Sequence, residues 1–344
     1  MKVSVIVVNW NRRDLLRNCL NSLKIQTATE FDIIVVDNGS VDGSPEMVER
    51  EYSGVRLIRN CENRGFCAAN NQGIQASQAE YVALLNNDAE AEAGWLEALL
   101  CAIERRPDCG MAASKILVYE DPDRIDKAGH LIYPDGQNRG RGSGELDRGQ
   151  YDGCDETLWP DGCAALYRRE MLTAIGGFDE DLFAYADDAE LGLRARIAGW
   201  RCVYTPKAIV RHHRGATLGL NSARRLALIE RNRVLLAIKL FPWSLLWLNP
   251  AYYLARLASG AWEAAQGRGE TSLYPGVAGK LTVATALLRG DCEALLLAPR
   301  MLRKRREIER IRKLSPRQVR ELILENKISL RELSGQSSAN GRHA

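Results

Sequence analysis

The chain of 344 residues is 46% hydrophobic and 26% charged, with a net charge of +3, which excludes a chain too polar to bury a sizeable core. Its nine cysteines include no CxxC pair, so the sequence predicts neither a zinc site nor a disulfide framework. The N-terminus enters a strand-like run at once, without the pattern of a secretory leader. We therefore expect a cytoplasmic protein body, built as one large domain or as a domain with an appendage.

The first 110 residues alternate between predicted strands and predicted helices. Apolar runs predict strands at 3–10, 31–40, 55–60 and 81–88, and the spacing between them predicts helices at 12–26, 44–52 and 66–77. This pattern indicates a parallel sheet, in which ligands bind beyond the carboxyl ends of the strands. Polar residues follow three of these strands, namely Asn9, then Asp37 with Asn38, and then Asn86 to Asp88.

Two common ways of holding a phosphate are absent from the sequence. The turn after the first strand, "NWNRRDLL", has no GxGxxG motif, and the chain contains no GxxxxGK[ST] motif. A divalent cation on Asp88 could hold phosphates instead, since Mg²⁺ typically uses one or two carboxylates together with phosphate oxygens and water.

Five motifs occur in one order along residues 1 to 240. They are "VSVIVVNWN", "VVDNGSVDGS", "NRGFCAANNQGI", "ALLNNDAE" and "GGFDEDLFAYADDAELGLRARIAGW". Together they resemble inverting family-2 glycosyltransferases, and in particular rhamnosyltransferase-like bacterial members. The resemblance implies the GT-A fold, an α/β fold with a Rossmann-like, mostly parallel central sheet flanked by helices.

The resemblance also implies a set of donor-binding residues. Asp37 corresponds to the residue that recognises the base, and Asn63 with Gly65 corresponds to the donor loop. "NND" stands where the family has its DxD signature, so Asn86 replaces the first acid and the metal-facing role falls to Asp88. The full donor-binding set is Asn9, Asn11, Asp37, Asn38, Ser40, Asn63, Gly65, Asn86, Asn87 and Asp88. Alternatively, Asn87 and Asp88 cap the next helix.

A catalytic base is implied by the last motif. A hydroxyl acceptor must lose a proton as it attacks, and a carboxylate within reach can take it. "ADDAEL" supplies Asp187, Asp188 and Glu190 at the start of a predicted helix. The family pattern places the base at Asp188, with Asp187 beside it. The alternative is that these acids only stabilise the helix N-terminus.

His212 is a candidate second metal ligand. It belongs to "RHH" at 211–213, and in some family members a histidine here completes the metal or diphosphate site. Imidazole suits Mn²⁺ better than Mg²⁺. The resemblance favours His212 over His213, although a histidine pair without a ligand role remains an alternative.

A segment at 129–172 links the two halves of this predicted domain. Its early part is rich in Gly, Arg and Asp, which predicts a mobile loop over the active site. Its later part, "WPDGCAAL", lies near the acceptor site by analogy with the family. Trp159, Asp161 and Gly162 are therefore the acceptor-binding candidates.

The C-terminal region differs in character from the rest of the chain. We divide the sequence into a catalytic domain at 1–220 with halves at 1–110 and 111–220, a helical, amphipathic and basic region at 221–335, and a disordered tail at 336–344. The helical region carries Trp and Tyr at 243–262, but prolines and a lysine interrupt it before a membrane span could form. Residues 300–320 hold ten Lys or Arg and only two Glu. These features favour either an anionic membrane surface or packing on the catalytic body or on a second subunit in a homodimer.

The sequence thus predicts a metal-assisted hexosyltransferase that uses Mg²⁺ or Mn²⁺ and a dTDP- or UDP-sugar. By resemblance, its product is a cell-surface polysaccharide or O-antigen built on a glycan or lipid-linked acceptor, at the inner face of the cell membrane. A nucleotidyltransferase would need a Gly-rich, basic first loop, which "NWNRRD" does not supply. The remaining alternative is a non-catalytic sugar-nucleotide-binding or membrane-adaptor protein.

Overall fold

The structure, a computed structural model, describes residues 1–28, 30–214, 222–266, 274 and 276–335. The predicted tail at 336–344 lies outside these residues. The chain forms two compact units, one of residues 1–130 and 140–217 and the other of residues 131–139 and 218–344. The sequence assigns residues 131–139 to the catalytic domain, whereas in the structure they cluster with the C-terminal helices.

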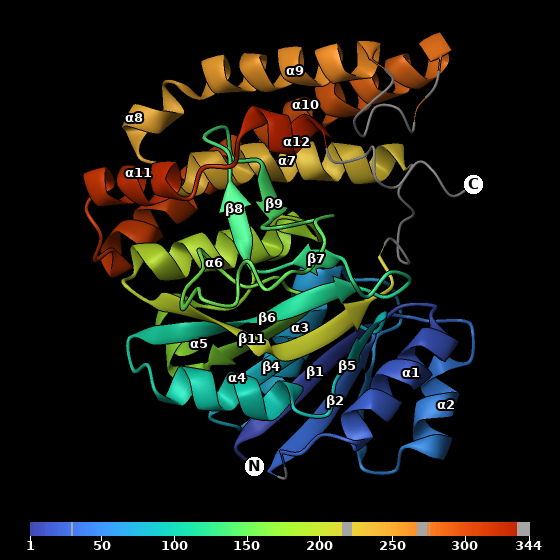
Figure 1. Ribbon diagram of the computed structural model, residues 1–344. Helices are drawn as coiled ribbons and strands as arrows, with labels where there is room; N and C mark the ends of the chain where they lie inside the picture. Colours follow the sequence, from blue (N-terminus) through green and yellow to red (C-terminus); the bar gives the residue numbers. More distant parts are fainter. Residues whose placement is uncertain (29, 215–221, 267–273, 275, 336–344) are drawn as a thin grey trace. The chain divides into compact units, whose positions relative to one another are not determined.

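The first unit begins with four neighbouring parallel strands in the order β3-β2-β1-β4 (Figure 1). They are β1 (Val3–Asn9), β2 (Phe31–Asp37), β3 (Val55–Arg59) and β4 (Tyr81–Leu85), connected by helices α1 (Arg13–Lys24), α2 (Ser44–Glu51) and α3 (Phe66–Ala76). Helix α1 buries Leu16, Cys19, Leu20 and Leu23. This spacing of three and four residues places one apolar stripe against the sheet.

Beyond β4 the sheet becomes mixed rather than mostly parallel. The next strands are β5 (Ala89–Ala91), β6 (Cys109–Val118), β7 (Ile125–Lys127), β10 (Ala164–Arg168) and β11 (Arg201–His212). Strand β10 runs antiparallel to both β4 and β6, whereas β11 is parallel to β6. The helices of this half are α4 (Trp95–Glu104), α5 (Arg169–Ile175) and α6 (Asp187–Ile197), with a 3₁₀ turn η1 (Glu180–Leu182).

The segment predicted as an unpacked loop contains packed structure, which corrects that part of the prediction, whereas its mobility stays a prediction. It contains β8 (His130–Ile132) and β9 (Asn138–Gly140), which form a two-stranded sheet. The acidic residues that suggested a loop instead have buried partners. Lys115 on β6 is only 5% exposed, and its Nζ lies 2.9 Å from Oδ2 of Asp147 and 2.5 Å from Oδ1 of Asp152. A buried lysine needs such compensation, and these acids therefore hold the segment in place.

The second unit is helical outside the 131–139 hairpin. It comprises α7 (Ala223–Leu240), α8 (Trp243–Leu246), α9 (Asn249–Ala265), α10 (Gly276–Ile311), α11 (Pro316–Glu325) and α12 (Leu330–Gly335). Helix α7 packs along α10. Ser315 is the N-cap residue of α11 and forms a capping box with Gln318. Among the described helices, none is long and apolar enough to cross a membrane.

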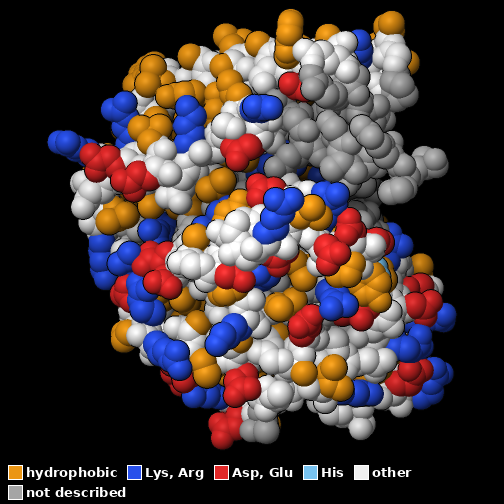
Figure 2. All heavy atoms as spheres, in the orientation of Figure 1, with side chains coloured by type: hydrophobic (Ala, Val, Ile, Leu, Met, Phe, Trp, Pro, Cys, Tyr) orange, Lys and Arg blue, Asp and Glu red, His pale blue; other side chains and the backbone are white. Residues whose placement is uncertain are grey.

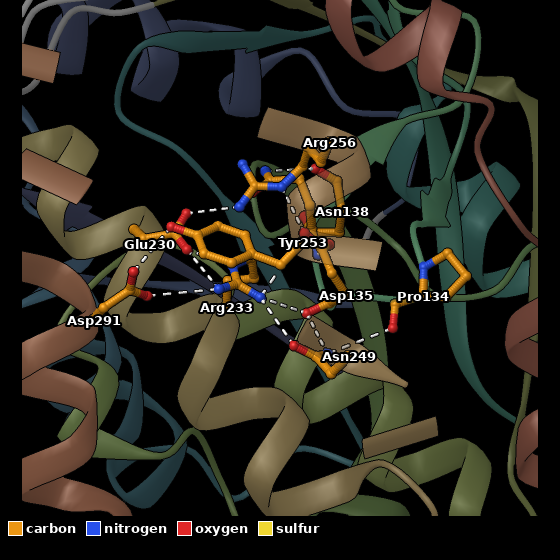
Figure 3. Close-up of polar contacts among 10 residues, drawn as sticks. Pro134, Asp135, Asn138, Glu230, Arg233, Asn249, Tyr253, Arg256 and Asp291 are labelled. Carbon is orange, nitrogen blue, oxygen red and sulfur yellow. Dashed lines mark hydrogen bonds and ion pairs between the residues drawn. The ribbon is translucent and has the colours of Figure 1, made fainter. Parts of the chain in front are cut away.

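A buried ionic cluster fixes the hairpin to these helices (Figure 3). Asp135 of the hairpin is fully buried, and its Oδ2 lies 2.5 Å from Nε of Arg256 on α9. Its backbone oxygen accepts a 2.8 Å hydrogen bond from Nη1 of Arg233 on α7. Glu230 on α7 pairs with both arginines, at 2.5 Å and 2.9 Å. Because a buried carboxylate is costly without such partners, Asp135 explains why residues 131–139 belong to the second unit.

Candidate active site

Three strand ends meet through side-chain hydrogen bonds at one edge of the first unit's sheet. Asn9 and Asp37 are paired in register at the ends of β1 and β2, and Asn9 Nδ2 donates to Asp37 Oδ1 at 3.1 Å. Asn87, just beyond β4, donates from Nδ2 to Asn9 Oδ1 at 2.7 Å. All three residues are buried. The structure therefore brings together the polar strand ends that the sequence predicted to form a ligand-binding edge.

Two turns beside this edge are locked to each other. Ser40 Oγ accepts a 2.9 Å hydrogen bond from the backbone N–H of Asn11, and the Ser40 N–H donates to Asp37 Oδ2 at 2.9 Å. Asn11 has a φ of 51°, in the left-handed region that asparagine tolerates better than most residues. The predicted donor residues Asn11, Ser40 and Asp37 thus form one ordered surface.

The loop at 63–65 is held against this surface by Asn38. Asn38 Nδ2 donates to Asn63 Oδ1 and to the backbone oxygen of Gly65, both at 3.1 Å. Gly65 has a φ of 87°, and a Cβ there would lie 2.5 Å from the Phe183 ring. Glycine is therefore required at 65 for both conformation and space.

A first acidic cluster, which we call the Asp88 cluster, consists of Asp88, His212 and Asp126. Asp88 is 5% exposed, and His212 Nε2 lies 3.4 Å from its Oδ1. On the other side of the ring, His212 Nδ1 is 2.8 Å from Oδ2 of the fully buried Asp126. His213 instead stacks on Tyr119, with ring centroids 3.6 Å apart. The structure thus brings the ring of His212, and not that of His213, to the Asp88 carboxylate, whereas the backbone N–H of His213 donates to the backbone oxygen of Asp88 at 2.9 Å.

The Asp88 cluster fits a divalent cation. Among the described residues, Oδ1 of Asp88 is buried without a hydrogen-bond partner, and it faces a histidine nitrogen. A carboxylate that orients the far nitrogen of a histidine is the usual support of a metal-binding imidazole, and Asp126 has that position. Burial favours the neutral form of Asp88, but the neighbouring His212 outweighs it and lowers the pKa of the carboxyl. Asp88 and His212 could therefore hold the ion, with Asp126 orienting His212.

A second cluster, which we call the Asp188 cluster, consists of Asp187, Asp188, Asp161, His130 and Lys127. Asp187 and Asp188 open α6 directly after a strained turn in which Phe183, Tyr185 and Ala186 have φ values of 64°, 70° and 55°. Such backbone conformations cost energy and concentrate at functional sites. The third acid of the predicted motif, Glu190, is fully buried and lies 2.7 Å from Arg194, so it supports the helix instead.

Asp187 and Asp188 differ in their electrostatic surroundings. Burial and the adjacent charge of Asp188 raise the pKa of Asp187 to about 8. Burial also raises the pKa of Asp188, but His130 and Lys127 oppose the rise. Of the two adjacent acids, Asp187 is therefore the one that more readily keeps its proton.

Asp161 contacts Lys127 and His130, and His130 in turn lies close to Asp188. Lys127 Nζ is 2.5 Å from Asp161 Oδ2, and His130 Nε2 is 2.7 Å from the same oxygen. His130 Nε2 also lies 3.3 Å from Oδ2 of Asp188. Although burial works in the other direction, Lys127 and His130 hold the pKa of Asp161 well below its usual value. The sequence analysis missed both Lys127 and His130, because neither stands in a motif.

His130, Asp161 and Asp188 are themselves close enough to share a metal ion, with candidate ligand atoms within 4.8 Å of one another. However, Lys127 already places a positive charge on Asp161. A cation bound there would have to compete with this ammonium group. In the Asp88 cluster, Nε of Arg214 lies 2.9 Å from Oδ1 of Asp126, whereas Oδ1 of Asp88 has no hydrogen-bond partner among the described residues, so Asp88 is the better candidate.

The remaining acceptor candidates are placed as follows. Trp159 is fully buried, and its ring is stacked on His130 with centroids 6.1 Å apart. A Cβ at Gly192 of α6 would lie 2.2 Å from Trp159, so this tryptophan packs against the helix that carries Asp188. Gly162 donates its N–H toward Asp188 Oδ2 over 3.5 Å. The structure buries the ring of Trp159 and leaves it no exposed face. Stacking of Trp159 on a sugar stays a prediction.

Comparison with known proteins identifies the family of this chain. Residues 4–176 match the family described as glycosyl transferase family 2, and residues 147–264 match glycosyl transferase family group 2. The chain belongs to glycosyl transferase family 2. The prediction made from the five motifs is thereby confirmed.

Two similar proteins with names come from bacteria. The chain is 30% identical over 257 residues to N-acetylglucosaminyl-diphospho-decaprenol L-rhamnosyltransferase of Mycobacterium tuberculosis, which covers 65% of this chain and 80% of the relative. It is also 29% identical over 226 residues to the O-antigen biosynthesis protein RfbC of Myxococcus xanthus, covering 63% of this chain and 18% of that protein.

Solved structures show the same fold. A mannosyltransferase from Pyrobaculum calidifontis, in complex with GDP-Man and Mn²⁺, aligns with a TM-score of 0.54 at 20% identity, covering 86% of this chain and 87% of that one. GalNAc-T7 with UDP, GalNAc and Mn²⁺ aligns with a TM-score of 0.59 at 15% identity, covering 87% of this chain and 56% of that one. The fold is therefore GT-A, as predicted, with a helical C-terminal region.

Proposed function

We propose that this glycosyltransferase moves a hexose from a nucleoside diphosphate to a hydroxyl group, with a divalent cation and with inversion at the anomeric carbon. Rhamnose from a dTDP donor is the first candidate, because of the similarity to the mycobacterial rhamnosyltransferase. Glucose, galactose or another hexose from UDP is the alternative. One observation carries the proposal most directly: the first unit holds two separate carboxylate sites, Asp88 facing His212 beyond β4 and Asp188 at the start of α6 beside His130.

On the donor side, the ordered surface of Asn9, Asn11, Asp37 and Ser40 would bind the nucleoside, and Asn63 with Gly65 would close over it. Asp88 and His212 would hold Mg²⁺ or Mn²⁺, which when bound neutralises the negative charge that develops on the departing diphosphate. The Mn²⁺ and nucleotide ligands of the two similar structures support this assignment.

On the acceptor side, Asp188 would take the proton from the attacking hydroxyl. Its side chain is 12% exposed, so it can be reached, and His130 and Lys127 oppose the rise that burial causes in its pKa. Asp187 would stay protonated and would not compete as a base. Direct attack on the anomeric carbon, with the diphosphate leaving from the opposite side, would invert its configuration.

The acceptor we propose is a lipid-linked or polymeric glycan of the cell envelope. The mycobacterial relative's name describes a prenyl-diphosphate acceptor, and that of the Myxococcus relative describes O-antigen synthesis. Work on such an acceptor would place the enzyme peripherally at the cytoplasmic face of an anionic membrane, as a monomer or a homodimer.

A panel of nucleotide sugars tests this function. Purified protein is incubated with Mn²⁺ and each donor, and release of the nucleoside diphosphate is measured with and without a prenyl-diphosphate-linked sugar. We expect turnover with one donor class, and a product of inverted configuration by NMR. Absence of turnover with every hexose donor, or a product of retained configuration, would contradict the proposal.

A further inference from the structure

Helix α9 turns its polar side chains inward. Arg256 binds Asp135 and Glu230, and Asn249 Nδ2 donates to the backbone oxygen of Asp135 at 2.9 Å (Figure 3). Tyr253 donates from its hydroxyl to Asp291 Oδ2 of α10 at 2.9 Å, and the Arg233 guanidinium lies 4.5 Å from the centre of its ring. The groups that would normally face water are thus used to hold α9 within the second unit.

The outward side of α9 is consequently apolar. Every exposed residue of this fully described helix is uncharged and nonpolar: Pro250, Ala251, Leu254, Ala258, Ala261, Trp262 and Ala265. Leu254 is 64% exposed and Trp262 is 67% exposed. Figure 2 shows hydrophobic side chains gathered along the edge where Figure 1 places α9. A surface helix of a soluble protein normally shows the opposite arrangement.

The apolar side continues into the chain before α9. Trp247 is 81% exposed and Leu248 is 44% exposed, and both precede α9 directly. We call the exposed residues of 247–265 the α9 face. Tyr252 and Tyr253, which the sequence includes in its aromatic stretch, are only partly exposed and do not belong to it.

Positive charge lies beside one end of the α9 face. Arg305 on α10 contacts the ring of Trp243 on α8, with 4.7 Å from its guanidinium carbon to the ring centre. The arginine-rich end of α10 is therefore next to α8, which directly precedes Trp247 in the sequence. Residues 300–310 carry six Lys or Arg and two Glu, and Arg303 and Arg306 are exposed. An apolar surface with a basic border is complementary to an anionic lipid bilayer.

We propose that the α9 face inserts into the interfacial layer of an anionic membrane, with the arginine-rich end of α10 contacting lipid phosphates. Trp247 and Trp262 lie near the two ends of the face, and tryptophan favours this interfacial depth. A second copy of the chain would offer the same excess of positive charge, whereas anionic lipid offers the opposite sign. This inference extends the membrane location included in the proposed function, and it can be measured without sugar transfer.

Vesicle binding by the full chain tests the inference. Co-sedimentation is measured with phosphatidylcholine vesicles that contain or lack phosphatidylglycerol, at low and high salt. We expect binding to the anionic vesicles, weakened by salt. The double variant Leu254→Glu/Trp262→Glu should lower the partition coefficient by roughly tenfold or more, because two large apolar side chains no longer leave water.

Ile25→Glu is the matched control, since Ile25 is 62% exposed but lies in the first unit. It should bind vesicles like the wild type. The inference is overturned if the wild type binds no vesicles, or if the double variant binds as well as the control. A wild-type dimer in light scattering that becomes monomeric in the double variant, without vesicle binding by either, would instead assign the α9 face to a second copy. Donor turnover, measured in the same samples, separates failure of this inference from failure of the proposed function.

Discussion

The Asp88 cluster and the Asp188 cluster both combine aspartates with a histidine, but their electrostatics differ. Each has carboxylates and a buried histidine within one unit. In the first, His212 between two aspartates lowers the pKa of Asp88 despite its burial. In the second, burial raises the pKa of Asp188, the assigned base, and raises that of the adjacent Asp187 to about 8. A carboxylate that stays ionised suits a cation, whereas one with a raised pKa suits proton transfer.

The difference shows that residue type alone does not assign a role at this site. The arrangement of the residues decides the role. In the Asp88 cluster a histidine lies between two aspartates, whereas in the Asp188 cluster two aspartates are adjacent in sequence at the start of α6. Four variants test whether the two clusters have the separate roles proposed for them.

The largest effect is expected from Asp188→Asn. This change keeps the size and helix-capping capacity of the side chain but removes the proton acceptor, so transfer should fall by roughly 10²- to 10⁴-fold. Thermal unfolding should be little changed. Initial rates with the preferred donor measure the effect, with Asp187→Asn as the neighbouring control. If Asp187→Asn abolishes transfer and Asp188→Asn does not, the base is Asp187.

A smaller effect is expected from Asp126→Asn in the other cluster. An amide orients the metal-binding nitrogen of His212 less firmly than a carboxylate does, so Mn²⁺ affinity should fall by roughly 10- to 100-fold. Titration of Mn²⁺ in the presence of nucleoside diphosphate measures this. Asp108→Asn, at a surface ion pair with Arg106, should leave the affinity unchanged. Equal affinity in the Asp126→Asn variant would remove Asp126 from the metal site.

The pH dependence should change in Lys127→Met. Lys127 opposes the rise in the pKa of Asp188, so its removal should raise that pKa further. Because the base acts in its ionised form, the acidic limb of the rate profile should move to higher pH. Lys115→Met, which removes another lysine paired with aspartates, is the control and should not move the limb. A limb that moves to lower pH would contradict the assigned role of Lys127.

The smallest effect concerns stability and Asp187. The pKa of Asp187 is about 8 in the folded protein and about 3.9 in the unfolded chain. The protonated carboxyl group therefore contributes fully to the free energy of unfolding below the unfolded pKa, and this contribution is lost as the pH rises toward 8. Asp187→Asn should therefore stabilise the protein near pH 8, by on the order of 1 kcal/mol or more, since each pKa unit is worth about 1.4 kcal/mol. Urea unfolding at pH 5 and pH 8 measures the difference. A variant less stable than the wild type at pH 8 would show that the Asp187 carboxylate is well accommodated.

Much of the donor edge could be predicted from the sequence, because local patterns determine it. Apolar runs located β1, β2 and β4, and parallel pairing then required Asn9, Asp37 and Asn87 to meet. The antiparallel course of β10 was not predicted, since strand direction depends on contacts distant in sequence. The packed structure within 129–172 was also missed, because Lys115, 32 residues away in the chain from Asp147, supplies its partner.

The Asp188 cluster was predicted only in part for the same reason. The motif gave Asp187 and Asp188, but their surroundings come from separate segments of the chain. His130 lies 31 residues before Asp161, and no local pattern links the two. Asp126 was missed likewise, since it contacts His212 across 86 residues. The inward side of α9 depends on Asp135 and Glu230, which no helical periodicity within 249–265 reveals.

The most direct test of the separate roles is metal-dependent nucleotide binding by Asp88→Asn and Asp188→Asn, measured side by side. Isothermal titration with dTDP and with UDP, with and without Mn²⁺, gives the affinity that depends on the cation. We predict that Asp188→Asn retains the wild-type gain from Mn²⁺, whereas Asp88→Asn loses it. The opposite result, with the gain lost in Asp188→Asn and kept in Asp88→Asn, would place the cation among His130, Asp161 and Asp188 and would contradict the account.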